Sequence, residues 1–427
     1  MKASDIAQIF EVFDVNPLEG KDIDFYYEKR TSPTDELAAI LHAGKTPSKF
    51  LFSGLMGSGK STELNILSKK IAEDYFVVQF SVFETLSIHD ITYVDLLITI
   101  GSEIYKQAYD GGIKISGDLC KDLSEWMSKR TKIEITGEKV SVGLEAGLNY
   151  LFAKLGTKMQ AEATTREEIR KELKLQLGDL IEKINTIIYD IEDKPQLKNS
   201  GKKIIVIIDD LDKLDLKESE DLFYNYSSSL AMPKCSIVYT IPIALVHSTN
   251  YTQIKLNFAN AFILPNIRIL KSNGERDEKE RDILKGIVKK RMNPDLISDD
   301  ALNAAIENSG GSLYQFIYTI RFASIKAIMR NSSQIELNDV NKIIIDRRNE
   351  FDRILRKEQY LILEEIRRTK TAVGGELLME LFHNQSVLEY LNDKRWCNVH
   401  PLVIPLLEER LKIGKLKKTK NSKGMAE

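Results

Sequence analysis

The 427-residue chain has 61 Lys and Arg against 63 Asp and Glu, a formal net charge of −2, with 43% hydrophobic and 29% charged residues. This mixture excludes disordered and low-complexity classes, and the near-neutral charge means that nucleic-acid binding would need a local basic patch. Three scattered cysteines predict neither a disulfide framework nor a zinc site. Without an apolar run near the ~18 residues of a membrane span, and without an apolar signal core, we expect a cytoplasmic protein.

The first part of the chain alternates short apolar runs with amphipathic segments. Residues 49–53 and 75–82 are strand-sized and apolar. The segment after Gly59 and the segment over 91–109 repeat their apolar residues with a period near 3.6, which is typical of helices. Strand, helix, strand, helix in this order predicts a parallel sheet with right-handed crossovers.

The alternation stops over residues 111–165, a glycine-rich segment that we interpret as an insertion into the sheet domain. Within it, residues 139–142 are a candidate strand and residues 142–156 a candidate helix that packs on its own domain or on a partner. One long helix is expected from 165 to 193. Further strands are expected over 204–208, 236–240 and 261–264, and the β-branched IIVII run of the first of these is typical of a central parallel strand.

Beyond residue 270 the sequence predicts helices. A period near 3.6 is found over 283–292, 300–308, 313–330 and 339–348. The last part, from about 351, contains two helical segments. It ends in a basic run over 410–423 with seven Lys or Arg and no acid, which is either a solvated tail or a contact for phosphate backbones and acidic partners.

A complete phosphate-loop motif, G-x-x-x-x-G-K-[ST], occupies residues 54–61. In such a loop successive backbone N–H groups surround an anionic phosphate, and the following helix adds its positive N-terminal dipole. Lys60 is expected to neutralise the β- and γ-phosphates of ATP and Ser61 to ligate Mg²⁺. The alternative, a connecting turn with a capping serine, is disfavoured by the strand before and the helix after. The residues expected to hold the nucleotide are Gly54, Gly57, Ser58, Gly59, Lys60, Ser61 and Thr62.

Acidic residues follow the most apolar strand. Asp209 and Asp210 leave its carboxyl end, where ligands of parallel sheets bind. We expect Asp209 to hold Mg²⁺ together with Ser61, and Asp210 to polarise the attacking water. The alternative is a solvated acidic turn. Thr240 ends the next strand and is expected to reach the γ-phosphate or the water, with a plain strand-ending threonine as the alternative.

These motifs together resemble the AAA+/STAND branch of P-loop ATPases, most clearly in GLMGSGKSTEL (54–64) and IIVIIDDLDKL (204–214). The resemblance covers about residues 20–350. It implies an α/β fold in which a parallel sheet flanked by helices binds ATP against an α-helical lid, followed by a small winged-helix-like C-terminal module. The expected division is a P-loop ATPase domain over 1–270 with the insertion at about 111–165, a lid over 271–350, and the C-terminal module with its basic tail over 351–427.

The lid departs from the pattern of that branch, which often carries an arginine a few residues after a Gly-Gly pair. Tyr314 stands nearest to that place, and Arg321 lies about two helical turns further along. Arg321 is therefore the candidate nucleotide contact, with a structural arginine as the alternative. Candidates for an arginine finger from a neighbouring subunit are Arg166, Arg170 and Arg268.

The leading hypothesis is a Mg²⁺-dependent ATPase that acts as a switch, as a homo-oligomer or through a separate effector protein. A role in antiviral defence or stress signalling follows by analogy with the branch alone. One alternative is a DNA-binding loader or remodeller that uses the C-terminal module and the basic run. Another is a scaffold with slow nucleotide turnover. A small-molecule kinase is disfavoured because the acid pair lies about 150 residues after the loop and a helical lid follows.

Overall fold

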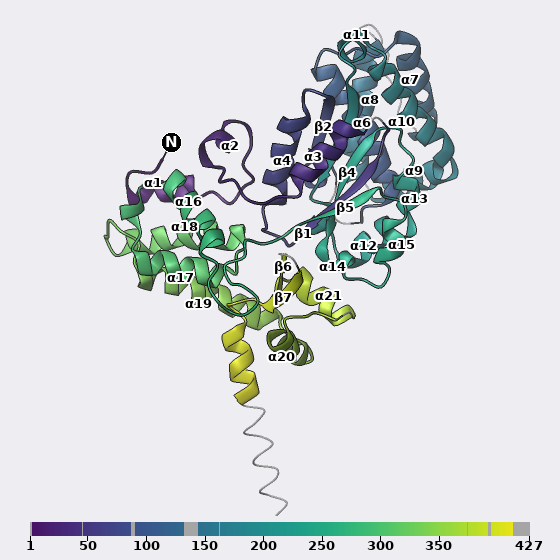
Figure 1. Ribbon diagram of the computed structural model, residues 1–427. Helices are drawn as coiled ribbons and strands as arrows, with labels where there is room; N and C mark the ends of the chain where they lie inside the picture. Colours follow the sequence, from purple (N-terminus) through teal and green to yellow (C-terminus); the bar gives the residue numbers. More distant parts are fainter. Residues whose placement is uncertain are drawn as a thin grey trace, which may run out of the picture.

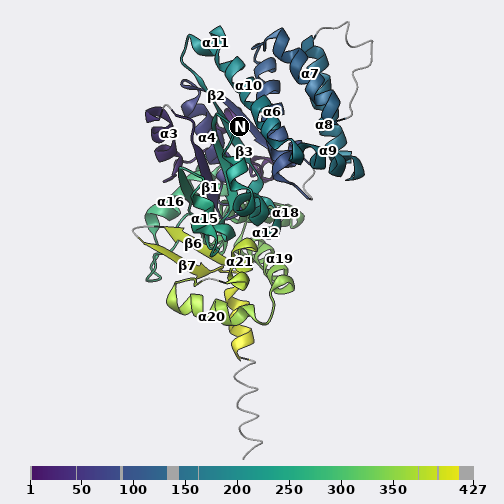
Figure 2. The same cartoon turned by 90° about the vertical axis from the view of Figure 1, so that its right-hand side faces the viewer.

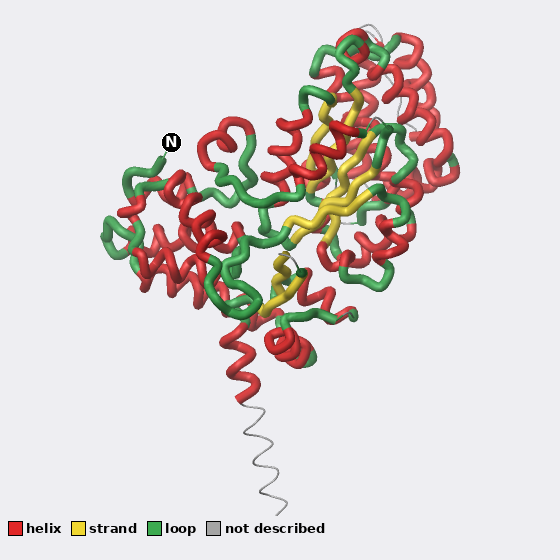
Figure 3. Tube along the Cα trace, in the orientation of Figure 1, coloured by secondary structure: helices red, strands yellow, loops and turns green. Residues whose placement is uncertain are grey.

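The computed structural model describes residues 2–44, 46–86, 90–131, 144–161, 163–373, 375–391 and 394–412. It contains a parallel five-stranded sheet with the order β2-β3-β4-β1-β5 (Figures 1 and 3). Five of the strands predicted from the sequence are confirmed. They are β1 (Lys49–Gly54), β2 (Tyr75–Ser81), β3 (Lys203–Asp209), β4 (Ser236–Pro242) and β5 (Asn260–Leu264).

The register of the sheet brings the functional motifs to one edge. Ser81 at the end of β2 lies opposite Asp209 of β3, and Phe52 near the end of β1 lies opposite Thr240 of β4. Because all these strands are parallel, their carboxyl ends face the same side. The phosphate loop that follows β1 therefore shares this edge with the acids that follow β3.

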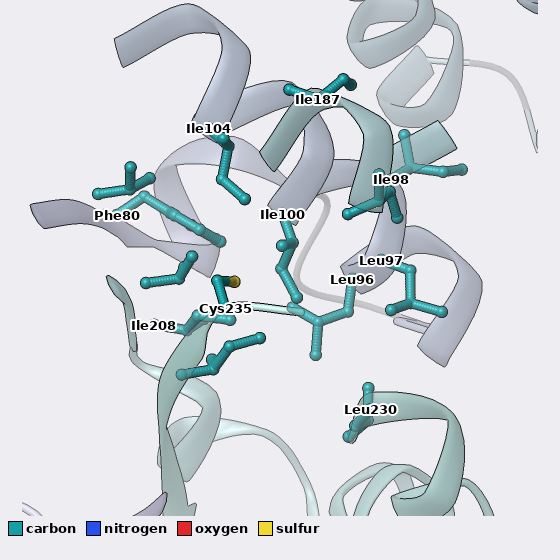
Figure 4. Close-up of a cluster of buried hydrophobic side chains, with 14 of the residues drawn as sticks. Phe80, Leu96, Leu97, Ile98, Ile100, Ile104, Ile187, Ile208, Leu230 and Cys235 are labelled. Atoms are coloured by element: carbon teal, nitrogen blue, oxygen red, sulfur yellow. The ribbon is translucent and has the colours of Figure 1, made fainter. Parts of the chain in front are cut away.

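Alternate residues of β3 enter two different hydrophobic clusters, as the period of two in a strand requires. Ile205 and Ile207 pack with α3 (Thr34–Ala43) and α4 (Lys60–Ile71) on one face. On the other face, Val206 and Ile208 pack with α6 (Tyr93–Asp110) and α10 (Leu177–Glu192). Figure 4 shows Ile208 beneath the aliphatic side chains of α6, with Ile187 of α10 above them. The sheet is thus covered by helices on both faces, which explains the apolar character of β3 throughout.

Further helices lie on the outer side of α6 and α10 (Figure 2). They are α7 (Gly117–Thr131), α8 (Leu144–Ala161) and α9 (Ala163–Leu175), which pack on one another and on α6. The candidate strand over 139–142 lies outside the described residues. The single helix expected over 165–193 is instead two helices, because Gln176 leaves the helical conformation at φ −115° and ψ 32° between α9 and α10.

The helices predicted beyond residue 270, in the expected lid, are confirmed as α16 (Glu278–Arg291), α17 (Asp299–Ser309), α18 (Leu313–Met329) and α19 (Leu337–Ile354), and α1 (Ile6–Val12) packs against α18. After them come α20 (Gln359–Thr369) and α21 (Glu376–His383), an antiparallel hairpin of β6 (Val387–Leu391) and β7 (Arg395–Val399), and a helix over 404–412. The lid helices and the C-terminal elements share one hydrophobic cluster. Most of the basic run over 410–423 lies outside the described residues.

Short elements complete the described chain, and none of its helices is both long and apolar enough to cross a membrane. The short helices are α2 (Gly20–Tyr26), α5 (Val82–Thr85), α11 (Pro195–Lys198), η2 (Leu211–Lys213), α12 (Leu216–Glu220), η3 (Asp221–Asn225), α13 (Ser227–Leu230), α14 (Ile243–Val246), α15 (Tyr251–Lys255) and η4 (Pro294–Leu296).

The buried face of α10 provides a test of the cluster drawn in Figure 4. Ile187→Ala is expected to lower the free energy of unfolding by roughly 2–5 kcal/mol, because it leaves a cavity at a side chain that is 2% exposed. Tyr189→Ala, on the same helix at a position that is 56% exposed, should change it by less than about 1 kcal/mol. Urea unfolding followed by circular dichroism measures both, and equal destabilisation by the two variants would contradict this packing.

Candidate functional site

Glycines shape the loop between β1 and α4. Gly57 and Gly59 adopt φ values of +77° and +96°, in the left-handed region that side-chain-bearing residues rarely enter. A Cβ atom at Gly57 would also lie 2.7 Å from the Cβ of Tyr314, at the start of α18. The backbone N–H of Tyr314 donates to the carbonyl of Gly57 at 3.1 Å. The lid therefore contacts the loop directly, and only glycine fits at the point of contact.

Lys60 is buried at the first position of α4. Its Nζ donates to the carbonyls of Gly54 and Leu55 at 2.9 and 3.0 Å, and it lies 2.8 Å from Oδ2 of Asp212. The side chains of Lys60 and Asp212 are only 5% and 3% exposed. Two charges that would each be costly to bury alone are thus neutralised as a pair. The burial of Asp212 argues against the alternative of a solvated acidic turn, in which this residue would be exposed.

Three carboxylates gather behind this pair. Ligand atoms of Asp209, Asp210 and Asp212 lie within 4.8 Å of one another. Burial, together with the negative charges of Asp212 and Asp210, raises the pKa of Asp209 to about 6, and Ser61 hydrogen-bonds the Asp209 carboxylate. The second oxygen of Asp212 is buried without a hydrogen-bond partner in the described part of the chain. Clustered carboxylates, a hydroxyl and an unsatisfied oxygen are a donor set that fits a hard divalent cation such as Mg²⁺.

Asp210 and Thr240 are both engaged in the turn after β3. Asp210 accepts a hydrogen bond from the Ser81 hydroxyl at 2.5 Å and pairs with Lys213 at 2.5 Å. Thr240 is fully buried; its hydroxyl donates to the carbonyl of Ile208 at 3.1 Å and accepts from the N–H of Leu211 at 3.0 Å. Thr240 therefore braces the turn that carries the acids.

A cavity of about 560 Å³ opens over the loop, a size suited to a nucleotide. Of the residues predicted to act, five line it together with Asp212: Gly57, Gly59, Lys60, Ser61 and Thr62. Those outside its lining are Gly54, Ser58, Asp209, Asp210, Thr240 and Arg321. Ser58 is buried behind the loop, where its carbonyl accepts a hydrogen bond from Arg30 at 2.8 Å.

The predicted arginines have other partners. Arg321 forms an ion pair with Asp14 and stacks on the ring of Phe10, 4.2 Å from its centroid, because its side of α18 meets α1 and the chain after it. The finger candidates are also paired: Arg170 with Asp95 at 2.5 Å, Arg166 with Asp90 at 3.6 Å, and Arg268 with Asp277 at 2.6 Å.

Arg347 of α19 lines the cavity, as does Arg291 at the end of α16. Its Nε donates to Gln315 at 3.1 Å, and its guanidinium lies 5.1 Å from the ring centroid of Tyr318. Sequence reasoning missed Arg347 because only the packing of α19 against α18 turns it toward the loop.

The opposite part of the cavity is formed by the N-terminal segment and α16, which sequence reasoning also missed. Residues 15–18, Tyr26 and Ile283 are among its lining. The N–H of Leu18 donates to the hydroxyl of Thr62 at 3.0 Å, which ties this segment to α4. Tyr26, Ile283 and Ile287 form an apolar wall on this side, with the charged Arg291 of α16 among the same lining residues.

A parallel sheet with a glycine-rich loop after β1 and buried acids after β3 defines a P-loop NTPase domain. Residues 30–237 match the model of the KAP family P-loop domain. A search of curated proteins finds no match to the sequence.

Several solved structures are similar at low identity. The Aeropyrum pernix ORC2 protein, solved as ADPNP–ADP complexes, is 12% identical with a TM-score of 0.41, covering 94% of this chain and 98% of its own. A Walker-type ATPase of Pyrococcus abyssi is 15% identical with a TM-score of 0.44 and coverages of 93% and 99%. The RuvB Holliday junction branch migration motor of Thermotoga maritima is 13% identical with a TM-score of 0.36 and coverages of 90% and 95%. Similarity at these scores establishes neither a shared activity nor a shared partner.

The raised pKa of Asp209 predicts a stability effect in protein free of divalent cations. Asp209→Asn should raise the free energy of unfolding at about pH 7.5 by up to about 3 kcal/mol, because it removes a buried charge from beside two others. The gain should be complete above the folded pKa of about 6 and shrink as the pH falls toward the usual value of 3.8. Urea unfolding in chelator across this pH range measures it; destabilisation by the variant at about pH 7.5 would contradict the electrostatic account.

Proposed function

We propose that this chain is a Mg²⁺-dependent ATPase whose lid responds to the nucleotide. One observation carries the proposal: the buried ammonium of Lys60 lies in a glycine loop, 2.8 Å from an acid that belongs to a cluster of three carboxylates. A cation at the phosphate end and carboxylates beside it are the parts that phosphoryl transfer uses. The apolar wall formed with α16 suits an adenine ring, and the sequence contains no guanine-reading motif.

Each residue has a role that its surroundings support. Backbone N–H groups of the loop bind the phosphates, and Lys60 leaves Asp212 to neutralise the β- and γ-oxygens. Mg²⁺, when bound, neutralises charge that develops on those oxygens. Ser61 and Asp209, already joined by a hydrogen bond, are its proposed ligands. Asp210 accepts the proton of the attacking water, and Ser81 holds that carboxylate in place.

The contact between the loop and the lid supports a switch. The backbone N–H of Tyr314 donates to the carbonyl of Gly57, and Leu313 packs beside Gly59. Because these contacts hold the start of α18, a phosphate that shifts the loop also shifts α18. In this proposal residues 1–270 hydrolyse ATP, the helices of 271–350 close over it, and the winged-helix-like module of 351–427 transmits the state. The resemblance also predicts that the chain forms a homo-oligomer or acts through a separate effector protein, that it binds DNA, and that it has a role in defence. These statements remain predictions.

Loss of the ammonium tests nucleotide binding. Lys60→Ala should weaken Mg²⁺–ATP binding at least about 30-fold, equivalent to roughly 2 kcal/mol, because the phosphates lose their buried cation. Lys69→Ala, a lysine of the same helix whose side chain is 47% exposed, should bind as the parent does. Calorimetric titration measures both affinities.

A double variant separates this loss of binding from misfolding. Lys60→Ala with Asp212→Asn removes both charges of the buried ion pair, so neither is left without its partner, and the protein should fold and still fail to bind ATP. Retention of tight ATP binding by that folded double variant would contradict the proposed function.

Removal of the proposed proton acceptor tests the chemistry. Asp210→Asn should lower the rate of phosphate release by about 10²–10⁴-fold while changing ATP affinity less than about threefold, because the proton acceptor and not the binding cradle is lost. Asp215→Asn, which caps α12 a few residues further on, is the matched control and should keep the parent rate. An Asp210→Asn protein that hydrolyses as fast as the control would remove Asp210 from the mechanism.

A further inference from the structure

One residue of the C-terminal elements reaches the nucleotide cavity. Gln385, in the turn between α21 and β6, lines the same cavity as Lys60 and Asp212. It is separated from the loop by more than 300 residues of sequence. No hydrogen bond or ion pair engages its side chain in the part of the chain that the structure describes. Its amide can therefore both donate and accept toward the cavity.

The position of α21 indicates which part of the cavity Gln385 faces. Burial lowers the pKa of His383 at the end of this helix, against the opposing influence of Asp215 and Asp212. α21 packs on α14, which follows β4, and β4 in turn contacts η2, the helix that carries the partner of Lys60. Gln385 follows His383 by two residues. It lines the cavity together with Lys60, Asp212 and Lys213.

The turn itself is firmly held. Tyr390 of β6 donates through its hydroxyl to the carbonyl of Gly310 in the lid at 2.6 Å. On the other side, Glu389 lies 2.8 Å from the imidazole of His247, which stacks on Phe382 of α21 with ring centroids 4.0 Å apart. The hairpin is thus fixed both to the lid and to the sheet domain, as its place between them in Figure 1 illustrates. A side chain presented from this turn has a defined position.

The backbone conformation of Gln385 allows its side chain to be removed without disturbing the turn. Its φ of +63° lies in the left-handed region, where glycine meets no steric cost. The turn therefore needs no side chain at this position. The glutamine side chain adds a neutral amide to the lining of the cavity, where Asp212 has an oxygen without a hydrogen-bond donor in the described part of the chain.

We propose that the side-chain amide of Gln385 contacts the terminal phosphate of bound ATP and its attacking water, so that the C-terminal elements complete the hydrolytic site; this rests on the proposed function. In the reaction the water oxygen bonds to the γ-phosphorus as the bond to the bridging oxygen breaks. ADP leaves with that electron pair, and the proton of the water passes to Asp210. Gln385 makes and breaks no covalent bond; it orients the water and donates to a phosphate oxygen.

Two substitutions test this role by steady-state phosphate release and by ATP titration of the full chain. Gln385→Gly removes the side chain where the backbone favours glycine, and it should lower kcat by about 10–1,000-fold with ATP affinity within about threefold. Gln385→Glu keeps the size and the turn but replaces the amide donor by a carboxylate. It should lower kcat by a similar factor and also weaken ATP binding, through repulsion of the phosphates.

The readouts separate the possible results. If the side chain were purely structural, Gln385→Glu would hydrolyse ATP at the parent rate. That result would overturn the inference while leaving the proposed ATPase activity intact. Glu376→Gln is the matched control: it makes the reverse exchange at an exposed position of α21 outside the cavity lining, and it should keep the parent rate. A parent protein that does not hydrolyse ATP would instead overturn the proposed function itself.

Discussion

The buried ion pair between Lys60 and Asp212 is the constraint on which the site depends. Neither charge is tolerable alone at this depth, so each can leave the pair only when another partner replaces it. A triphosphate that takes Lys60 leaves Asp212 beside two further carboxylates. We therefore expect phosphate binding to require a cation at the acids, which makes nucleotide and metal binding interdependent through a single exchange of partners.

Much of the fold could be predicted because its signals are local. The five strands are short apolar runs bounded by turns, and β3 is β-branched because helices cover both faces of the sheet. The spacing of the motif also predicted that Gly57 and residues 59–62 share one loop, and these residues line the cavity. The break at Gln176 was not predictable, because the apolar stripe continues across it and only backbone angles reveal it.

The rest of the site depends on tertiary packing, which no local pattern encodes. Helical periodicity placed Arg321 on the same side of its helix as Tyr314. It could not predict that Arg321 pairs with Asp14, or that Arg347 of the next helix lines the cavity. The burial of Asp212 depends on contacts between segments far apart in the sequence: η2 is held to β4 by the hydrogen bond from Leu211 to Thr240, and Asp212 pairs with Lys60. Gln385 carries no motif at all, and only the docking of α21 brings it near the loop.

This docking limits how the lid can move. The turn before α18 is packed so closely that a Cβ atom at Gly311 would overlap the carbonyl of Ile267, and the neighbouring Gly310 is held by Tyr390 of the hairpin. Any shift of α18 that follows a change at Gly57 must therefore be transmitted to β6 or be resisted by it. The hairpin also contacts His247, which follows α14, so it links α18 to the part of the chain that carries the sheet. A ligand that displaced the hairpin would thus loosen the lid and withdraw Gln385 in the same movement.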